Sequence, residues 1–435
     1  MNKRIGIRHE DKYVMERRVA LPPDTVKELI KQGLEVFVER SPKRIFKDQE
    51  FVEAGATVAH SLSQSPVIFG VKEIPPAWFE EGKTYIFFSH VIKGQPYNMP
   101  MLRAMMEKKC SLIDYEKIAD ENGKRLIFFG RFAGLAGMIN SLWSFGERMK
   151  TLGIETPFTG IKQSHTYNSL AEAEAAVRQA GEIIKTQGLP ESLVPFTIGF
   201  TGYGNVSQGA QHIANILPTI EITPSELLQL KERGIYSGKI IYKVVFKEED
   251  LSEHIDPQGK FELQDYYRHP EKYKNQFEKY PPHLSILMNC MYWDERYPRI
   301  LTKNYIEKLY QQGNMKLQVV GDVTCDPDGS IEFTHKGTNI EDPVFVYNPL
   351  DRKPTMGFKG DGILVMAVDI LPSELPREAS ESFGHALIRF VPAIATANYD
   401  LDFDKIALPH EIKRAMILHK GKLTPDYEYI HEYLK

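Results

Sequence analysis

The segment Thr197–Ala210, with the sequence TIGFTGYGNVSQGA, constrains the fold of this chain more than any other. Small apolar and β-branched residues come first, as in a buried strand, and then come Gly202, Gly204 and, further on, Gly209. A pyrophosphate binds where a strand leads through a glycine turn into a helix, because backbone N–H groups point at it there and no Cβ obstructs it. The spacing is G-x-G-x-x-x-x-G and departs from the strict G-x-G-x-x-G, so the motif by itself indicates either a nucleotide-binding turn or an ordinary glycine-rich turn.

Strand-like and helix-like segments alternate around this motif. The strand-like segments are RIGIRHE (4–10), EVFVER (35–40), VIFGVKE (67–73), TYIFFSH (84–90), SLIDYE (111–116), SILMNCMYW (285–293), LQVVGDVTCD (317–326) and GILVMAVDIL (362–371). Strands separated by helices predict parallel sheets that helices cover on both faces. We therefore expect an α/β protein with two Rossmann-like, doubly wound parallel-sheet domains and a cleft between them.

The chain length of 435 residues is sufficient for two domains of ordinary size. We expect residues 1–160, joined by about 372–435, to form a substrate domain. Residues 190–371 are expected to form a dinucleotide-binding Rossmann domain. A Tyr- and Lys-rich stretch within it is longer and more polar than a usual connection between a helix and a strand, so we interpret residues 226–283 as an insertion.

Charge and composition exclude some classes of function. Lys and Arg number 54 against 58 Asp and Glu, a net charge of −4, which argues against a nucleic-acid binder. Three cysteines without a C-x-x-C pair indicate a reducing compartment and favour neither a structural metal site nor a disulfide framework. No apolar run is long enough to cross a membrane, and residues 1–13 lack the apolar core of a signal peptide. We expect a soluble cytoplasmic protein without bound metal.

Charged residues follow several of the predicted strands, at the end of a parallel sheet where ligands bind. They are Arg8, Lys72, Glu73, His90, Asp114, Glu116, Asp322, Asp326 and Asp369, and Arg17 and Arg18 follow the first strand. Lysine, histidine, glutamate and arginine side chains that converge from neighbouring strand ends can bind carboxylates and transfer protons. Each also has an ordinary interpretation, such as a solvated lysine at a strand end for Lys72 or a turn cap for Asp326.

Taken together, the motifs resemble the lysine–ketoglutarate reductase group, the saccharopine dehydrogenases that form lysine, within the alanine dehydrogenase/transhydrogenase fold family. The resemblance covers nearly the whole chain, through ERRVAL (16–21), GVKEIP (70–75), FFSHVIKGQ (87–95), LIDYEKI (112–118), FGRFAGLAGMIN (129–140), FTGYGNVSQGAQ (200–211), MNCMYW (288–293), DVTCDPDGSIEF (322–333) and VDILPSELPREASESFG (368–384). GNVSQGAQ, DPDGSIEF and LPSELPREAS are closer to the reductase half of bifunctional lysine-degrading enzymes than to alanine dehydrogenases. Since the sequence ends at Lys435, we expect the second dehydrogenase of those enzymes to be absent.

The resemblance implies that lysine and 2-oxoglutarate condense to an imine, which a reduced nicotinamide nucleotide reduces to saccharopine. It implies acid–base roles for Lys72 and His90. The substrate-lining positions that it implies are Arg18, Gln95, Arg125, Phe129, Thr324, Cys325 and Asp326. The cofactor-binding positions that it implies, together with the glycine turn, are Gly202, Gly204, Asn205, Tyr292, Val323, Val368, Asp369, Ile370 and Leu371.

The kind of nucleotide stays open between two sets of residues. An acidic residue about 20 positions after the glycine turn would hold the ribose 2′-hydroxyl of NAD. Glu221 and Glu226 are near that point, whereas Thr223, Ser225, Lys231 and Arg233 would accommodate the 2′-phosphate of NADP. The resemblance to the animal enzymes favours NADPH, with NADH as the alternative.

Two other functions compete with the reductase. An alanine dehydrogenase-like enzyme acting on ammonia and pyruvate would share the fold and the lysine–histidine pair. A non-catalytic NAD(P)-binding protein would share only the fold, but the presence of Lys72, His90 and Arg18 together argues against it. The expected partners are small molecules (lysine, 2-oxoglutarate and saccharopine) and neither nucleic acid nor membrane, and the oligomeric state is left open.

Overall fold

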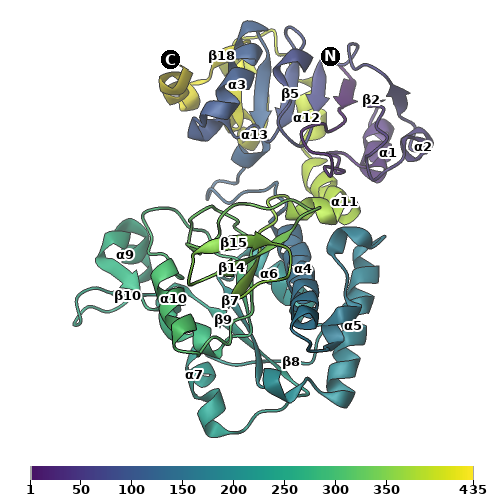
Figure 1. The fold of residues 1–435 in the computed structure, drawn as a ribbon. Coiled ribbons are helices and arrows are strands. Elements are labelled where there is room, and N and C mark those ends of the chain that lie inside the picture. The colour runs from purple at the N-terminus through teal and green to yellow at the C-terminus, as the bar shows by residue number, and fades with distance from the viewer. Residues whose placement is uncertain (1, 435) are drawn as a thin grey trace. The chain divides into compact units, whose positions relative to one another are not determined.

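A computed structural model describes residues 2–434 of the chain. The chain forms two compact units (Figure 1). Unit 1 consists of Met1–Phe129 and Pro376–Lys435, and unit 2 is Gly130–Leu375. Each unit is built on a mixed, mostly parallel eight-stranded sheet. The α/β class and the two doubly wound sheets expected from the sequence are therefore confirmed.

The sheet of unit 1 has the strand order β18-β17-β6-β5-β4-β1-β2-β3. Its strands are β1 (Arg4–Ile7), β2 (Glu35–Glu39), β3 (Thr57–Ala59), β4 (Val67–Phe69), β5 (Thr84–Phe87), β6 (Ser111–Asp114), β17 (Met416–His419) and β18 (Lys422–Leu423). The first six pair in parallel, and β17 adds antiparallel to β6 from the returning C-terminal segment. The carboxyl ends of β1, β4, β5 and β6 consequently lie along one edge of this sheet.

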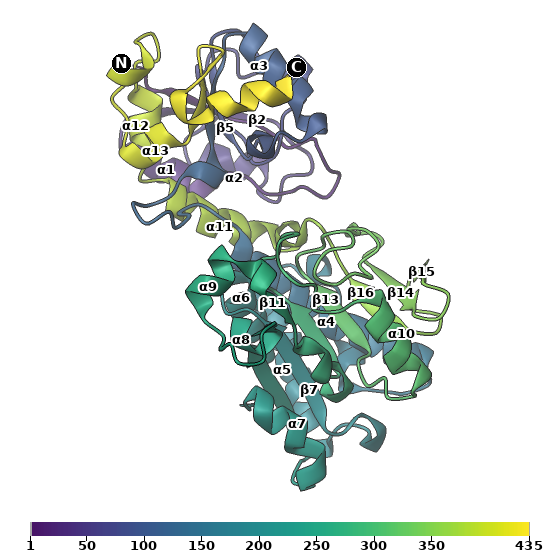
Figure 2. The same cartoon turned by 90° about the vertical axis from the view of Figure 1, so that its left-hand side faces the viewer.

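The helices of unit 1 are α1 (Pro23–Lys31), α2 (Asp48–Glu53), α3 (Met99–Glu107), α11 (Pro376–Leu387), α12 (Val391–Thr396) and α13 (His410–Arg414). α1 begins at a proline, whose missing N–H is not needed in the first helical turn. The final segment, the 3-10 helix Pro425–Leu434, runs beside α3 (Figure 2). Its Tyr429 hydroxyl donates to the carbonyl of Ile92 at 2.9 Å, so the C-terminal segment fastens the loop that follows β5.

The sheet of unit 2 has the strand order β15-β14-β16-β13-β12-β7-β9-β8. Its strands are β7 (Phe196–Thr201), β8 (Thr219–Glu221), β9 (Ile241–Phe246), β12 (Ile286–Asn289), β13 (Val319–Asp322), β14 (Val344–Asn348), β15 (Lys353–Met356) and β16 (Ile363–Met366). Six of them are parallel, and β14 and β15 extend the sheet antiparallel beyond β16. The strand beside β7 is β9, and β8 lies at the edge.

The insertion begins later than the sequence indicated. Residues 241–246 lie inside the stretch that we interpreted as an insertion, yet they form β9 and pair along their whole length with β7. The inserted part comprises α8 (Glu248–Leu251), β10 (Ser252–His254), α9 (Leu263–Arg268) and β11 (Tyr273–Asn275). Its strands β10 and β11 form a small antiparallel sheet of their own, separate from the main sheet of unit 2 (Figure 1).

Besides α8 and α9, the helices of unit 2 are α4 (Gly130–Thr151), α5 (Leu170–Gln187), α6 (Asn205–Ala214), α7 (Pro224–Arg233) and α10 (Lys303–Gln311). α4 packs directly against α6, which follows the glycine turn (Figure 1). A Cβ on Gly134 would lie 1.8 Å from the carbonyl oxygen of Val206, and one on Gly209 would lie 2.1 Å from that of Arg131. This close contact explains why the unit boundary falls at residue 129 and not near 160. It also means that Gly209 serves helix packing.

Replacing Gly209 by alanine should destabilise unit 2 by about 1–3 kcal/mol, the usual cost of forcing an extra carbon into a close-packed interface. The new Cβ would push α6 away from the backbone of α4 at Arg131. Urea unfolding of the purified variant measures the effect. Gly160→Ala is the matched control, because a Cβ there meets nothing within 4 Å and should cost no stability. Equal midpoints for the two variants would contradict this account of the helix contact.

Within residues 2–434, no helix combines the length and the apolar character that a membrane span requires.

Candidate active site

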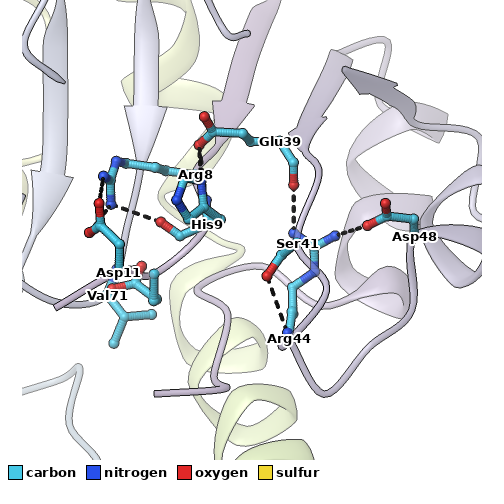
Figure 3. Close-up of polar contacts among 9 residues, drawn as sticks. Arg8, His9, Asp11, Glu39, Ser41, Arg44, Asp48 and Val71 are labelled. Carbon is cyan, nitrogen blue, oxygen red and sulfur yellow. Dashed lines mark hydrogen bonds and ion pairs between the residues drawn. The ribbon is translucent and has the colours of Figure 1, made fainter. Parts of the chain in front are cut away.

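Unit 1 gathers charged side chains at the carboxyl ends of β1, β4 and β5. The loop after β1 is held by a bidentate pair, in which Arg8 Nη2 and Nη1 contact the Asp11 carboxylate at 2.8 and 3.1 Å (Figure 3). Between them, the buried Glu10 accepts the backbone N–H groups of Val71 at 2.7 Å and of Lys72 at 2.9 Å. Burial and the neighbouring charge of Glu16 raise the pKa of Glu10 to about 7. The loop after β1 therefore fixes the turn that carries Lys72.

Lys72 lies in the electrostatic field of a second buried carboxylate. Burial raises the pKa of Glu16, but the charges of Arg18 and Lys72 outweigh it and leave the pKa below its usual value. Arg18 contacts Glu16 twice, from Nε to Oε1 at 2.8 Å and from Nη2 to Oε2 at 2.6 Å. Lys72 thus follows β4 next to an ion pair that is fully enclosed by protein.

His90 follows β5 and is oriented by Glu73. Its Nδ1 lies 2.8 Å from Glu73 Oε1, and Lys12 Nζ lies 2.6 Å from the same oxygen. Burial raises the pKa of Glu73, yet the hydrogen bonds and charges of His90 and Lys12 prevail and hold it at about 2. Since an ionised carboxylate only accepts, Nδ1 carries the hydrogen, and Nε2 of a neutral His90 is the nitrogen that can accept a proton.

Aromatic rings surround these charges. Phe88 stacks on His90 with a centroid distance of 6.2 Å, and Phe129 stacks on Phe383 at 4.4 Å. The guanidinium carbon of Arg18 lies 4.2 Å from the centre of the Phe129 ring. Such rings lower the local dielectric and strengthen charge interactions beside them. The structure thereby brings Lys72, His90, Arg18 and Phe129 into one network of unit 1.

The other two predicted substrate residues of unit 1 are more exposed. Arg125 has a 44% exposed side chain, and its Nη1 lies 3.8 Å from Glu116 Oε1. It also lines a pocket of about 490 Å³ that includes Lys117 and Tyr427. Gln95 follows the loop after β5 and accepts a hydrogen bond from the Tyr97 hydroxyl at 2.7 Å. Arg125 therefore has a longer contact with its carboxylate partner than Arg18 has, and its side chain is more exposed.

The glycine turn of unit 2 has the geometry that a pyrophosphate needs. Gly202 has φ of +76°, which L residues rarely adopt, and a Cβ on Gly204 would meet nothing within 4 Å. Asn205 is the first residue of α6. A pocket of about 390 Å³ opens beside the turn and is lined by Gly202, Gly204 and Tyr292 among others. The residues fit a nucleotide phosphate at the N-terminus of α6.

A second pocket of unit 2, of about 500 Å³, contains Thr324, Cys325, Asp326 and Asp369. The neighbouring Asp322 has a structural role, because its buried carboxylate accepts from Asn289 Nδ2 at 2.8 Å and Thr324 Oγ1 at 2.7 Å and so ties β12 to β13. Of the predicted cofactor residues, Val368, Ile370 and Leu371 have buried side chains, Asp369 is exposed and Val323 is half-buried.

Comparisons with known proteins agree with this geometry. Residues 6–136 match the family described as alanine dehydrogenase/PNT, N-terminal domain. A saccharopine dehydrogenase [NAD(+), L-lysine-forming] of Neurospora crassa is 30% identical over 405 residues, which cover 91% of this chain and 91% of that protein. The chain belongs to the L-lysine-forming saccharopine dehydrogenase family.

Two longer relatives match nearly the whole of this chain. The alpha-aminoadipic semialdehyde synthase of Arabidopsis thaliana is 40% identical and the mitochondrial one of Mus musculus is 34% identical, each over 98% of this chain. The chain spans only 41% and 47% of their respective lengths. Among solved structures, an L-alanine dehydrogenase superposes with a TM-score of 0.64 at 17% identity, covering 99% of this chain and 100% of that one, which shows a shared fold.

The sequence did not identify three of the charged residues that lie at this site in unit 1. Glu10, Lys12 and Glu16 lie in the loop after β1 and interact with residues that follow β4. The fragment ERRVAL included Glu16, but nothing in a single sequence shows which carboxylate faces which base. The only available signal was the density of charge between residues 8 and 18.

The ionisation of Glu73 should make stability depend on acid pH. A carboxyl whose pKa falls from 4.5 to about 2 on folding stabilises the protein fully above pH 4.5, and this is lost as the pH falls towards 2. The contribution is about 3–4 kcal/mol at 1.4 kcal/mol per pKa unit. Urea unfolding between pH 2.5 and 6 should show a flatter dependence for Glu73→Gln than for the wild type. Glu81→Gln, at an exposed site, is the control, and a Glu73→Gln profile parallel to the wild type would refute the assignment.

Proposed function

We propose that this chain is an NAD(P)H-dependent saccharopine dehydrogenase (L-lysine-forming), which condenses L-lysine with 2-oxoglutarate and reduces the imine to saccharopine in lysine degradation. The observation that carries the proposal is the cluster of Lys72, Glu16, His90 and Glu73 in a chain that aligns with a saccharopine dehydrogenase over nearly its full length. A lysine and a histidine, each beside its own carboxylate, provide the two proton-transfer groups that imine chemistry requires.

The proton transfers can be assigned to side chains. The ε-amine of free lysine has a pKa of about 10.4, so a base must remove its proton before the nitrogen attacks the keto carbon. The Nε2 of His90 suits this step because Glu73, itself held by Lys12, fixes the ring through Nδ1. An acid must then protonate the departing hydroxyl of the carbinolamine so that it leaves as water, and we assign this to the Lys72 ammonium.

We assign the remaining predicted residues to the binding of substrate and of cofactor. Arg125 is suited to pair with a substrate carboxylate through its planar guanidinium. The other proposed substrate-binding residues are Arg18, Gln95, Phe129, Thr324, Cys325 and Asp326. A reduced nicotinamide nucleotide would supply the hydride, and the proposed residues for holding it are Gly202, Gly204, Asn205, Tyr292, Val323 and Val368–Leu371.

The decisive assay follows oxidation of NADH, and separately of NADPH, by the purified protein given lysine plus 2-oxoglutarate. Ammonia plus pyruvate serves as the control pair. Oxidation that requires both lysine and 2-oxoglutarate supports the proposal. Oxidation with ammonia and pyruvate alone would assign the protein to alanine dehydrogenase chemistry, and nucleotide binding without any turnover would indicate a binding protein.

A further inference from the structure

The order of strands in unit 2 changes which residue lies next to the glycine turn. β9 is inserted between β7 and β8, and the N–H of Gly202 donates to the carbonyl of Phe246, the last residue of β9, at 3.0 Å. The residues that follow β9 therefore reach the turn, whereas those that follow β8 are one strand further away. In a Rossmann fold, the strand beside the first one carries the side chain that meets the adenosine ribose.

Glu248 occupies this position. It lies two residues after the end of β9 and lines the pocket beside Gly202 and Gly204. Its Oε1 accepts hydrogen bonds from the Tyr267 hydroxyl at 2.7 Å and from the Tyr203 hydroxyl at 3.4 Å. Both tyrosines bind the same oxygen, and across residues 2–434 no protein donor reaches Oε2. The carboxylate is thus fixed in orientation with one oxygen available to a ligand.

The residues that the sequence offered for contact with the adenosine ribose have other partners or lie further from the glycine turn. Glu221 lies at the end of the edge strand β8 and pairs with Lys243 Nζ at 2.8 Å. Glu226 accepts the backbone N–H of Thr223 at 2.8 Å and caps α7. Lys231 and Arg233, the candidates for a 2′-phosphate, lie in the last turn of α7, after the edge strand.

The pocket around Glu248 disfavours a phosphate. Its lining, as far as residues 2–434 form it, includes no lysine, arginine or histidine. Lys247, the neighbouring cation in sequence, is exposed and does not line it. Five tyrosines line it, and two of them, Tyr266 and Tyr267 of α9, come from the inserted part. A ribose 2′-phosphate would bring two negative charges towards a carboxylate without a compensating cation.

We propose that Glu248 binds the ribose 2′-hydroxyl and makes this enzyme selective for NADH over NADPH, and that the inserted part exists to build this pocket. The inference rests on the proposed function, in that a nicotinamide dinucleotide binds at the glycine turn. It departs from the NADPH preference that the family resemblance implied.

The test measures dissociation constants of NADH and NADPH for the apo-protein by isothermal titration calorimetry, so it does not depend on turnover. AMP and 2′,5′-ADP serve as fragments that carry only the adenosine end. We expect the wild type to bind NADH at least tenfold more tightly than NADPH, and AMP more tightly than 2′,5′-ADP. Glu248→Ser should reduce the NADH preference about tenfold, because a lost charge–phosphate repulsion and a lost hydrogen bond act in the same direction.

The matched control is Glu249→Ser, since Glu249 is exposed and does not line the pocket. This variant should keep the wild-type ratio, which separates a local contact from a change in net charge. Equal or tighter binding of NADPH by the wild type, or an unchanged ratio in Glu248→Ser, would overturn the inference and leave the proposed function standing. Binding of neither nucleotide by the folded wild type would overturn both.

Discussion

Replacing Lys72 by methionine should lower the turnover of lysine plus 2-oxoglutarate by about 10²–10⁴-fold, the usual contribution of a general acid or base. Methionine has nearly the length of lysine and no proton to give, while the backbone N–H that Glu10 holds is retained. Nucleotide affinity should stay close to that of the wild type, because the glycine turn belongs to unit 2. Steady-state kinetics for kcat and calorimetry for nucleotide binding measure the two effects separately.

His90→Gln should show the same pattern, since it removes the second proton-transfer group. The matched control is Lys31→Met, because Lys31 is 64% exposed in the last turn of α1 and makes a surface ion pair. Near-normal turnover in both Lys72→Met and His90→Gln would show that the acid–base assignment is wrong. A loss of nucleotide binding as large as the loss of turnover would also contradict it.

The sequence predicted most of the parallel strands of both units because each of these is a short apolar run bounded by turn residues or charges. β9 was not recognised, since Lys243 interrupts its apolar run. In the folded chain Lys243 is buried, with Nζ 2.8 Å from Glu221 Oε2 and 3.1 Å from Asn215 Oδ1. Those partners come from β8 and from the end of α6, so the burial of a charged residue in a strand depends on tertiary contacts that a local pattern does not encode.

Only some residues of the candidate site could be predicted from the sequence, for a related reason. Lys72 and His90 stand directly after recognisable strands, so their position at one sheet edge follows from topology alone. Glu16, beside Lys72, and Lys12, which contacts the Glu73 carboxylate that orients His90, come from a loop. The conformation of that loop depends on contacts with residues that follow β4. Glu248 was missed because the order of β8 and β9 in the sheet differs from their order in the chain.

Arg18→Met should destabilise unit 1 by about 3–5 kcal/mol, because it removes one partner of an ion pair buried on both sides. The Glu16 carboxylate has no exposed surface and would lose both hydrogen bonds from the guanidinium. The cation stacked on Phe129 would be lost with it. Urea unfolding at neutral pH measures the change in the free energy of unfolding.

Arg17→Met is the matched control, since the adjacent arginine is only half-buried and makes a 3.4 Å hydrogen bond to the Lys43 carbonyl. It should cost about 1 kcal/mol or less. Equal losses of unfolding free energy in Arg18→Met and Arg17→Met would mean that the buried Glu16–Arg18 pair contributes no more to stability than the contacts of Arg17. A large loss confined to Arg18→Met would mean that its guanidinium is needed to neutralise Glu16 beside Lys72, in which case the more exposed Arg125 is the better partner for a substrate carboxylate.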